Sequence, residues 1–142
     1  NLQMIPLHTD SFSVVLPMDH PLDKQSFRSI DQLSNESFIL FSSDYSPHYY
    51  AKIISICEDK GFYPKISHRS VHAYTIFKLV ESGMGVAIIP TSLKTGYQLN
   101  VKFLEINNIV QKTTLSAIWS VKNRNPVLHT IAEIIQNKKP TL

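Results

Sequence analysis

One segment of the chain combines hydroxyl groups, aromatic rings and a predicted helix start, a combination suited to holding a small anion. It covers residues 41–49, Phe-Ser-Ser-Asp-Tyr-Ser-Pro-His-Tyr, and follows a short apolar run. A helix start offers free backbone N–H groups and the positive end of the helix dipole, which suit a carboxylate or phosphate. Ser42 and Ser43 could add hydrogen bonds, and Tyr45 and Tyr49 could wall an aromatic or aliphatic body. The alternative is that Ser46 only caps the helix and that Ser42 and Ser43 are only turn residues.

A second candidate is the pair His68 and Arg69, which we expect in a loop between a short strand over 65–67 and the next helix. Arg69 could clamp an anion, and His68 could donate a hydrogen bond or titrate near neutral pH. The alternative is a solvated loop with no ligand. His68 and His72 are four residues apart, but no cysteine or carboxylate partner is evident, so we expect no metal site.

Catalytic motifs are not recognisable in this sequence. It has no Gly-x-Ser-x-Gly, no phosphate-binding Gly-x-x-x-x-Gly-Lys and no His-Glu-x-x-His. Ser43, Asp44 and His48 are close in sequence, but nothing places them as nucleophile, base and orienting group. Gly83 and Gly85 are typical of a tight turn rather than a phosphate cradle. We therefore expect neither an enzyme nor a bound cofactor.

The elements that must position these residues follow an alternating pattern of short strands and helices. This pattern predicts crossover units and an α/β fold with a mostly parallel sheet flanked by helices. Strands are predicted over 11–16, 38–41, 65–67, 85–90, 101–104 and 113–120, with one helical turn over 29–33. The first predicted helix is capped by Ser46, begins at Pro47 and turns Tyr50, Ile53, Ile54 and Cys57 inward. The second is capped by Ser70 and turns Ala73, Ile76, Phe77 and Val80 inward. The third covers 126–137 and turns Leu128, Ile131 and Ile135 inward.

Composition excludes several classes of protein. A hydrophobic content of 43% excludes a disordered tail. The net charge of +3 is too small to indicate nucleic-acid binding by itself. No apolar stretch approaches the roughly 20 residues that cross a bilayer. The single cysteine, Cys57, cannot form an intrachain disulfide and is expected to be a buried thiol, so we expect a reducing cytoplasm.

Several motifs in a fixed order resemble a known family. They are Leu16-Pro17, His20-Pro21-Leu22, Leu33 with Phe38-Ile39, Cys57 followed by Gly61-Phe62 and Pro64, and the run Val-Glu-Ser-Gly-Met-Gly-Val-Ala-Ile-Ile-Pro at 80–90. The ordered set resembles the effector-binding domain of LysR-type transcriptional regulators, from about Leu7 to about Ile135. The helix, Gly-x-Gly turn and apolar strand within 79–90 form its most specific part.

The resemblance implies two lobes like those of a type 2 periplasmic binding protein, with a ligand cleft between them. This chain would supply one full lobe and part of the other. Residues 1–17 would form a first-lobe segment and hinge strand, 18–115 the second lobe, and 116–142 the returning hinge strand and a first-lobe helix. The opening half of the first lobe and the DNA-binding domain would lie outside the chain.

The resemblance also implies a function. The domain would bind a small-molecule effector, form a homo-oligomer, act in the cytoplasm without a membrane, and reach DNA only through an N-terminal domain absent from this chain. Pro47 and Tyr49 match positions that face the effector in the family. The expected effector-binding residues are Ser42, Ser43, Pro47, Tyr49, His68 and Arg69. Alternatives are a solute-binding protein with similar lobes or an enzyme built on the same fold.

Overall fold

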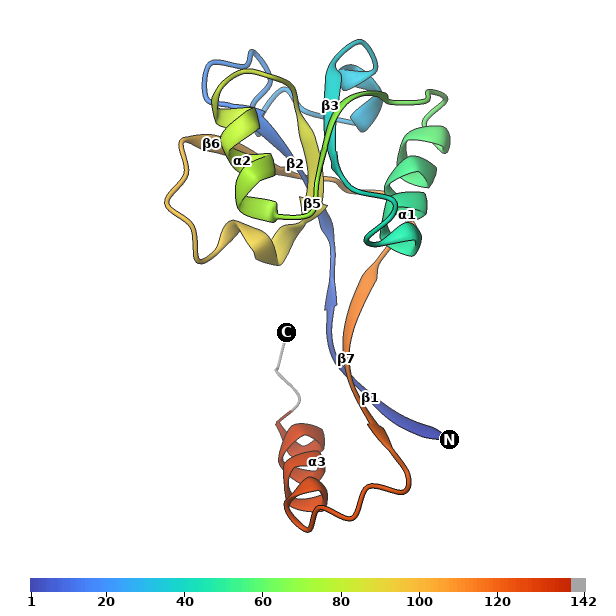
Figure 1. Cartoon of the computed structure of the whole chain (residues 1–142). Coiled ribbons are helices and arrows are strands. Elements are labelled where there is room, and N and C mark those ends of the chain that lie inside the picture. The colour runs from blue at the N-terminus through green and yellow to red at the C-terminus, as the bar shows by residue number, and fades with distance from the viewer. Residues whose placement is uncertain (139–142) are drawn as a thin grey trace. The chain divides into compact units, whose positions relative to one another are not determined.

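Strand β2 (Phe12–Pro17) is an inner strand of a mixed sheet, and its residues from Phe12 to Leu16 are buried. The computed structural model describes residues 1–138 and divides into two units (Figure 1). The larger unit is Ser11–Gln111, and the smaller combines Asn1–Asp10 with the chain from Lys112 onward. The other elements of the larger unit are η1 (Ile30–Leu33), β3 (Ser37–Phe41), α1 (Pro47–Glu58), β4 (Lys65–Ser70), α2 (Ala73–Glu81), β5 (Ala87–Pro90), η2 (Thr91–Lys94) and β6 (Val101–Glu105).

The sheet of the larger unit has parallel and antiparallel parts. β2 lies between β5 and β6 and runs antiparallel to both. β3 and β4 pair in parallel, and a parallel bridge between Phe38 and Val86 connects β3 to the start of β5. Four strands therefore share one direction and β2 opposes them. The prediction of a mostly parallel sheet is correct in that four of the five strands run in the same direction. Both pairings of β2 are nevertheless antiparallel.

Each of the two longer helices of the larger unit covers one face of this sheet. Ile53, Ile56 and Cys57 of α1 pack with the face that includes Val14 and Leu40. Ile76, Phe77 and Val80 of α2 pack with the opposite face, which includes Val15 and Ile39. Adjacent strand residues point to opposite faces, which explains why neighbours such as Val14 and Val15 are both fully buried. The predicted inward faces of both helices are thereby confirmed at Ile53, Ile54, Cys57, Ile76, Phe77 and Val80.

The turn before β5 is closed by a glycine that no other residue could replace without strain. Gly85 has φ +153°, and a Cβ there would lie 2.5 Å from the carbonyl oxygen of Ser37. That oxygen accepts the backbone N–H of Val86 at 2.8 Å, so β3 approaches this turn closely. β5 consequently starts at Ala87 rather than at residue 85 as predicted.

The smaller unit is an antiparallel ribbon followed by a helix. β1 (Leu2–Asp10) pairs with β7 (Thr113–Ser120) with an irregularity between Pro6 and His8, and α3 (Val127–Asn137) follows. Strand β1 was not among the predicted elements. Leu128 and Ile135 of α3 are half-buried, whereas Ile131, also predicted to face inward, is 47% exposed. Among the described residues of this unit, no apolar side chain is buried.

The structure places two predicted elements differently. Residues 68–70, expected in a loop, belong to β4, and His72 rather than Ser70 caps α2. Residues 11–16, expected to lead into the hinge, lie in the sheet of the larger unit, while β1 supplies the partner of β7. The assignment of 1–17, 18–115 and 116–142 to lobes stays a prediction. Across residues 1–138, no helix is both long and apolar enough to span a membrane.

Candidate functional site

The candidate site is the loop that leaves β3 and enters α1. β3 and β4 end side by side, since Phe41 is in register with Ser70. The backbone N–H of Ser42 donates to the carbonyl oxygen of Ser70 at 3.0 Å. The Ser42 carbonyl in turn accepts the N–H groups of Tyr45 and Ser46, at 3.3 and 3.1 Å. The loop is therefore a tight turn fixed to the carboxyl edge of the sheet, where open α/β sheets bind ligands.

Helix α1 begins in this loop without a side-chain cap. Ser46 is the N-cap residue and Pro47 follows it, as predicted, but the Ser46 side chain makes no capping hydrogen bond. The hydroxyls of Ser42 and Ser43 have no hydrogen-bond partner among the described residues. The first turn of a helix carries backbone N–H groups that the helix itself does not satisfy. The loop thus offers donors, together with the positive end of the dipole, to an anion.

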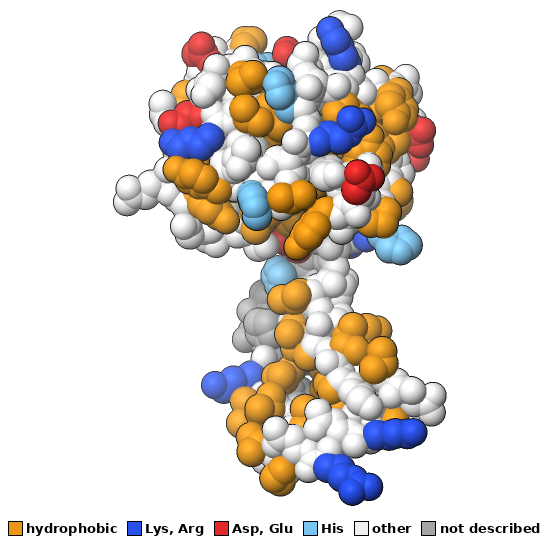
Figure 2. All heavy atoms as spheres, viewed as in Figure 1, with side chains coloured by type: hydrophobic (Ala, Val, Ile, Leu, Met, Phe, Trp, Pro, Cys, Tyr) orange, Lys and Arg blue, Asp and Glu red, His pale blue; other side chains and the backbone are white. Residues whose placement is uncertain are grey.

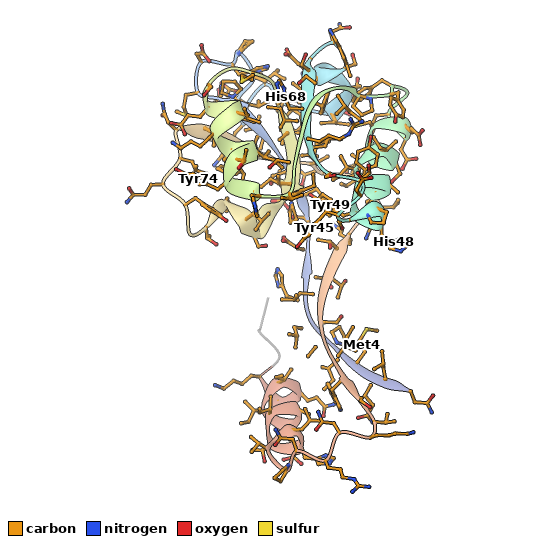
Figure 3. The ribbon with its side chains drawn as sticks, viewed as in Figure 1. Met4, Tyr45, His48, Tyr49, His68 and Tyr74 are labelled. Atoms are coloured by element: carbon orange, nitrogen blue, oxygen red, sulfur yellow. The ribbon has the colours of Figure 1, made fainter. Side chains whose placement is uncertain are left out.

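Tyr49 is held by the core of the unit. Its ring centroid lies 5.3 Å from that of Phe41 in an edge-on arrangement and 6.0 Å from that of Phe12. Its hydroxyl donates to the carbonyl oxygen of Ile88 at 3.4 Å. The expectation that Tyr49 walls a ligand site therefore concerns a half-buried ring with a fixed position, whereas Tyr45 is 74% exposed. Figure 3 shows both tyrosines at the same end of the larger unit.

Arg69 points toward α1, on the side of the candidate loop. Its guanidinium carbon lies 6.0 Å from the centroid of the Tyr50 ring. A hydrogen bond with the Tyr50 side chain is the main cause that raises the pKa of Arg69 above its usual value, and the charge of Asp44 adds to it. Arg69 is therefore a permanent cation whose environment includes a residue of the loop.

His68 is not brought to the loop. It is in register with Ile39, in the middle of β3, and its Nδ1 lies 3.1 Å from the Ser67 hydroxyl. Figure 3 shows His68 at the opposite end of the larger unit from Tyr45 and Tyr49. The structure therefore joins Ser42, Ser43, Pro47 and Tyr49 in one region, with Arg69 beside them, and separates His68. His68 is separated from the loop because β4 continues through residues 68–70, which were expected to form a loop.

Sequence reasoning missed a polar cluster at the same edge of the sheet. The Thr91 hydroxyl lies 2.8 Å from the hydroxyls of both Ser11 and Ser13, and Ser11 also donates to Glu105 at 2.8 Å. Thr91 follows the carboxyl end of β5. The rule that singled out the loop after β3 therefore also applies to the residue after β5. These bonds fix the point at which the chain enters β2.

The thiol and the titratable side chains of the larger unit have the following properties. Burial raises the pKa of the Cys57 thiol to about 12, which leaves no thiolate at neutral pH. Within residues 1–138, no three side chains of His, Cys, Asp or Glu are grouped closely enough to hold a metal ion. The loop donors and the nearby guanidinium are suited to hold a carboxylate.

Comparison with known families identifies the chain. Residues 1–139 match the family described as the LysR substrate binding domain. The chain belongs to this LysR family. This confirms the resemblance carried by the motifs between Leu16 and Pro90.

Two curated relatives of this LysR domain are HTH-type transcriptional regulators. TtuA of Agrobacterium vitis is 28% identical over 139 residues, which cover 95% of this chain and 46% of the relative. AlsR of Bacillus subtilis (strain 168) is 26% identical over 132 residues, covering 89% of this chain and 44% of the relative. The chain therefore spans nearly half the length of these relatives.

Solved structures confirm the fold. The BenM effector-binding domain with its effector benzoate matches with a TM-score of 0.79 and 19% identity, covering 96% of this chain and 62% of that one. The effector-binding domain of QuiR in complex with shikimate matches with a TM-score of 0.71 and 23% identity, covering 97% and 65%. The α/β fold with lobes like those of a type 2 periplasmic binding protein is thereby confirmed.

Proposed function

We propose that this LysR-family domain senses a small organic anion, bound at the loop Ser42–Tyr49, and thereby controls a transcriptional regulator. The observation that carries the proposal is the start of α1, which has no side-chain cap and lies beside two serine hydroxyls with no partner in residues 1–138, at the carboxyl edge of the sheet. These groups donate hydrogen bonds, which stabilise a negative charge. Pro47 leaves its first helical position without a backbone N–H, so the serines supply the additional donors.

The class of ligand follows from the donors. Benzoate and shikimate, which occupy the BenM and QuiR domains, both carry a carboxylate. In the proposed complex the carboxylate lies at the start of α1, with Ser42 and Ser43 as donors. Arg69 adds a positive charge from its place beside Tyr50 and Asp44. Tyr49 gives the proposed site a rigid aromatic side.

The smaller unit fits a proposal that it forms part of a lobe. Its exposed apolar side chains include Leu2, Met4, Leu115, Ile118, Val127, Ile131 and Ile134 (Figure 2). Apolar surface of this extent is ordinarily covered in a folded protein. In the proposed arrangement further residues of the first lobe cover it, and residues 1–17 and 116–142 are the parts of that lobe and its hinge within this chain.

The proposed signal is a shift between two arrangements of the lobes. An effector changes their populations only to the extent that it binds one arrangement more tightly than the other. The proposed regulator is a cytoplasmic homo-oligomer whose DNA contacts are made by a separate N-terminal domain. The curated relatives TtuA and AlsR support the role in transcriptional regulation, since both are HTH-type transcriptional regulators.

Calorimetric titration tests the anion-binding proposal. Benzoate, shikimate and malonate are titrated into the chain, each beside its uncharged amide. We expect at least one acid to bind and its amide to bind at least tenfold more weakly, because the amide lacks the charge that the helix start stabilises. Equal affinity for an acid and its amide would contradict the proposal.

A further inference from the structure

The sheet of the larger unit has an open edge at β6. β6 is the last strand in the order β5-β2-β6, and its only strand partner among the described residues is β2 (Figure 1). The backbone N–H of Ile106 donates to the carbonyl oxygen of Phe12 at 2.9 Å. Hydrogen-bonded pairs alternate along an antiparallel ladder, so the backbone groups of Val101, Phe103 and Glu105 face away from β2. These residues present a row of hydrogen-bonding groups along the edge.

A groove follows this edge. A hollow of about 620 Å³ is lined on one side by consecutive residues of β6, from Val101 to Leu104, and on the other by Met18 and the segment Asp23–Gln25. A second hollow of about 310 Å³ shares Lys24 and Leu104 with the first. Because all four neighbouring residues of β6 line it, the groove exposes the edge of the strand rather than one face.

The groove carries an excess of positive charge. Lys24, Arg28 and Lys94 line it, and none of the three forms an ion pair within residues 1–138. The two carboxylates in the groove already have partners. Asp23 accepts the backbone N–H groups of Gln25 and Ser26, both at 2.8 Å, and Glu105 accepts the hydroxyl of Ser11 at 2.8 Å.

The fourth cation in the groove, Lys102, is directed away from a ligand. Its ammonium donates to the carbonyl oxygen of Leu22 at 2.7 Å and also to that of His20. These bonds connect the segment around His20 to β6. Lys102 therefore maintains the wall of the groove, while Lys24, Arg28 and Lys94 supply its unpaired charge.

We propose that the β6 edge binds an extended acidic peptide segment of a partner protein as an additional strand. Strand addition uses backbone hydrogen bonds for affinity and side-chain pockets for specificity. The outward groups of Val101, Phe103 and Glu105 supply the bonds, the hollow by Met18 takes alternate apolar side chains, and the three cations face acidic ones. A second copy of the chain is disfavoured, because edge-to-edge pairing would bring two sets of the same cations together. This interaction is separate from effector binding and does not depend on it.

Three labelled peptides test the proposal by fluorescence anisotropy with the whole chain. The first is a hexapeptide of alternating glutamate and valine, the second replaces each glutamate with lysine, and the third is the first with alternate backbone amides methylated. We expect the first to bind and the others to bind at least tenfold more weakly. Equal binding of the methylated peptide would overturn the proposal, since such a ligand cannot form the strand hydrogen bonds. No binding of the first peptide would overturn it as well.

Variants of the chain locate the binding. Lys24→Glu combined with Lys94→Glu should lower the affinity for the acidic peptide at least tenfold. Lys65→Glu combined with Lys122→Glu changes the net charge equally on exposed residues outside the groove and should leave the affinity within about twofold. An equal loss in both pairs would overturn the proposal, because it would show an effect of net charge alone.

One further variant tests the backbone of β6. Phe103→Pro removes an N–H that faces away from β2, a position where edge strands tolerate proline. Circular dichroism checks that this variant is folded. If it is not folded, the methylated peptide tests the same backbone hydrogen bonds with the unaltered chain. We expect Phe103→Pro to abolish peptide binding. A dimer of the unaltered chain that Phe103→Pro dissociates, seen by light scattering, would assign the edge to a second copy and overturn the proposal.

Discussion

The backbone N–H of Ser42 and the carbonyl oxygen of Ser70 are joined by a 3.0 Å hydrogen bond that connects the ends of two parallel strands. This bond ties the loop before α1 to the segment before α2. α1 and α2 cover opposite faces of the sheet. A ligand held by Ser42 and Ser43 would therefore lie next to the bond that joins the segments leading into α1 and α2.

Ser43→Ala should weaken binding of the organic acid found by calorimetry about tenfold or more. The hydroxyl has no protein partner among the described residues, so its loss removes a hydrogen bond to the ligand's charge, worth roughly 1.5–3 kcal/mol, at little cost to the fold. Titration calorimetry of the variant measures the change. His68→Ala is the control and should leave the affinity within about twofold, since His68 lies at the other end of the unit. A large loss of affinity with His68→Ala and none with Ser43→Ala would show that the ligand binds elsewhere and would contradict the proposed site.

Gly85→Ala should lower the free energy of unfolding by roughly 3 kcal/mol or more. The added Cβ would meet the Ser37 carbonyl oxygen, which is fixed by its hydrogen bond to Val86. Gly83→Ala is the matched comparison, because Gly83 also has a positive φ, +75°, but nothing lies within 4 Å of its added Cβ. It should cost only about 1–2 kcal/mol. Urea unfolding of both variants measures the difference, and equal losses would show that the contact with Ser37 is unimportant.

The stability of the larger unit should fall as the pH rises above about 9 through the ionisation of Cys57. An unfolded thiol loses its proton near pH 9.0, whereas burial raises the pKa of folded Cys57 to about 12. The folded state therefore binds more protons between these values, and the free energy of unfolding decreases by at most about 1.4 kcal/mol per pH unit.

The variant Cys57→Ala isolates this contribution. It lowers stability at every pH because it leaves a cavity, but it should remove the part of the alkaline slope that Cys57 causes. Urea unfolding between pH 8 and 10 gives both slopes. Identical slopes would contradict the burial of the thiol. Labelling of Cys57 by a thiol reagent should accordingly require unfolding.

The two units should unfold in separate transitions. Every buried apolar side chain of the described residues lies between Phe12 and Ile106, so the smaller unit has little to stabilise it. Trp119, the single tryptophan, lies in β7 and donates to Gln3 of β1 at 2.9 Å. Its fluorescence should change at lower urea concentration than the far-ultraviolet circular dichroism of the whole chain. Coincident curves from the two probes would show one cooperative unit.

Local patterns predicted the elements that form the core. The apolar run at Phe38–Phe41 and the helical spacing of Ile53, Ile54 and Cys57 depend only on neighbouring residues, and both predictions are confirmed. β1 could not be found this way. Most of its residues are exposed, and its partner β7 lies more than a hundred residues along the chain, as the hydrogen bond between Gln3 and Trp119 shows.

The candidate site was predictable where it follows from a strand end and a helix start, as for Ser42, Ser43 and Pro47. The expected loop at His68 is wrong, because polar side chains in this segment do not prevent a strand. In the structure the backbone of that segment pairs with Ile39 and Leu40, and strand pairing places no demand on polar side chains at the sheet margin. The contact between Thr91 and Ser11 joins distant segments, so neighbouring residues carry no signal of it.

Mapping of ligand-induced shifts in the amide resonances of the isotopically labelled chain tests the central claim most directly. This measurement detects weak binding and locates it residue by residue. The largest shifts on titration of the organic acid should fall in Ser42–Tyr49 and Ser70–His72, with no comparable shift at His68. Shifts confined to other residues, or none at any concentration of the acids tested, would contradict anion sensing at the start of α1.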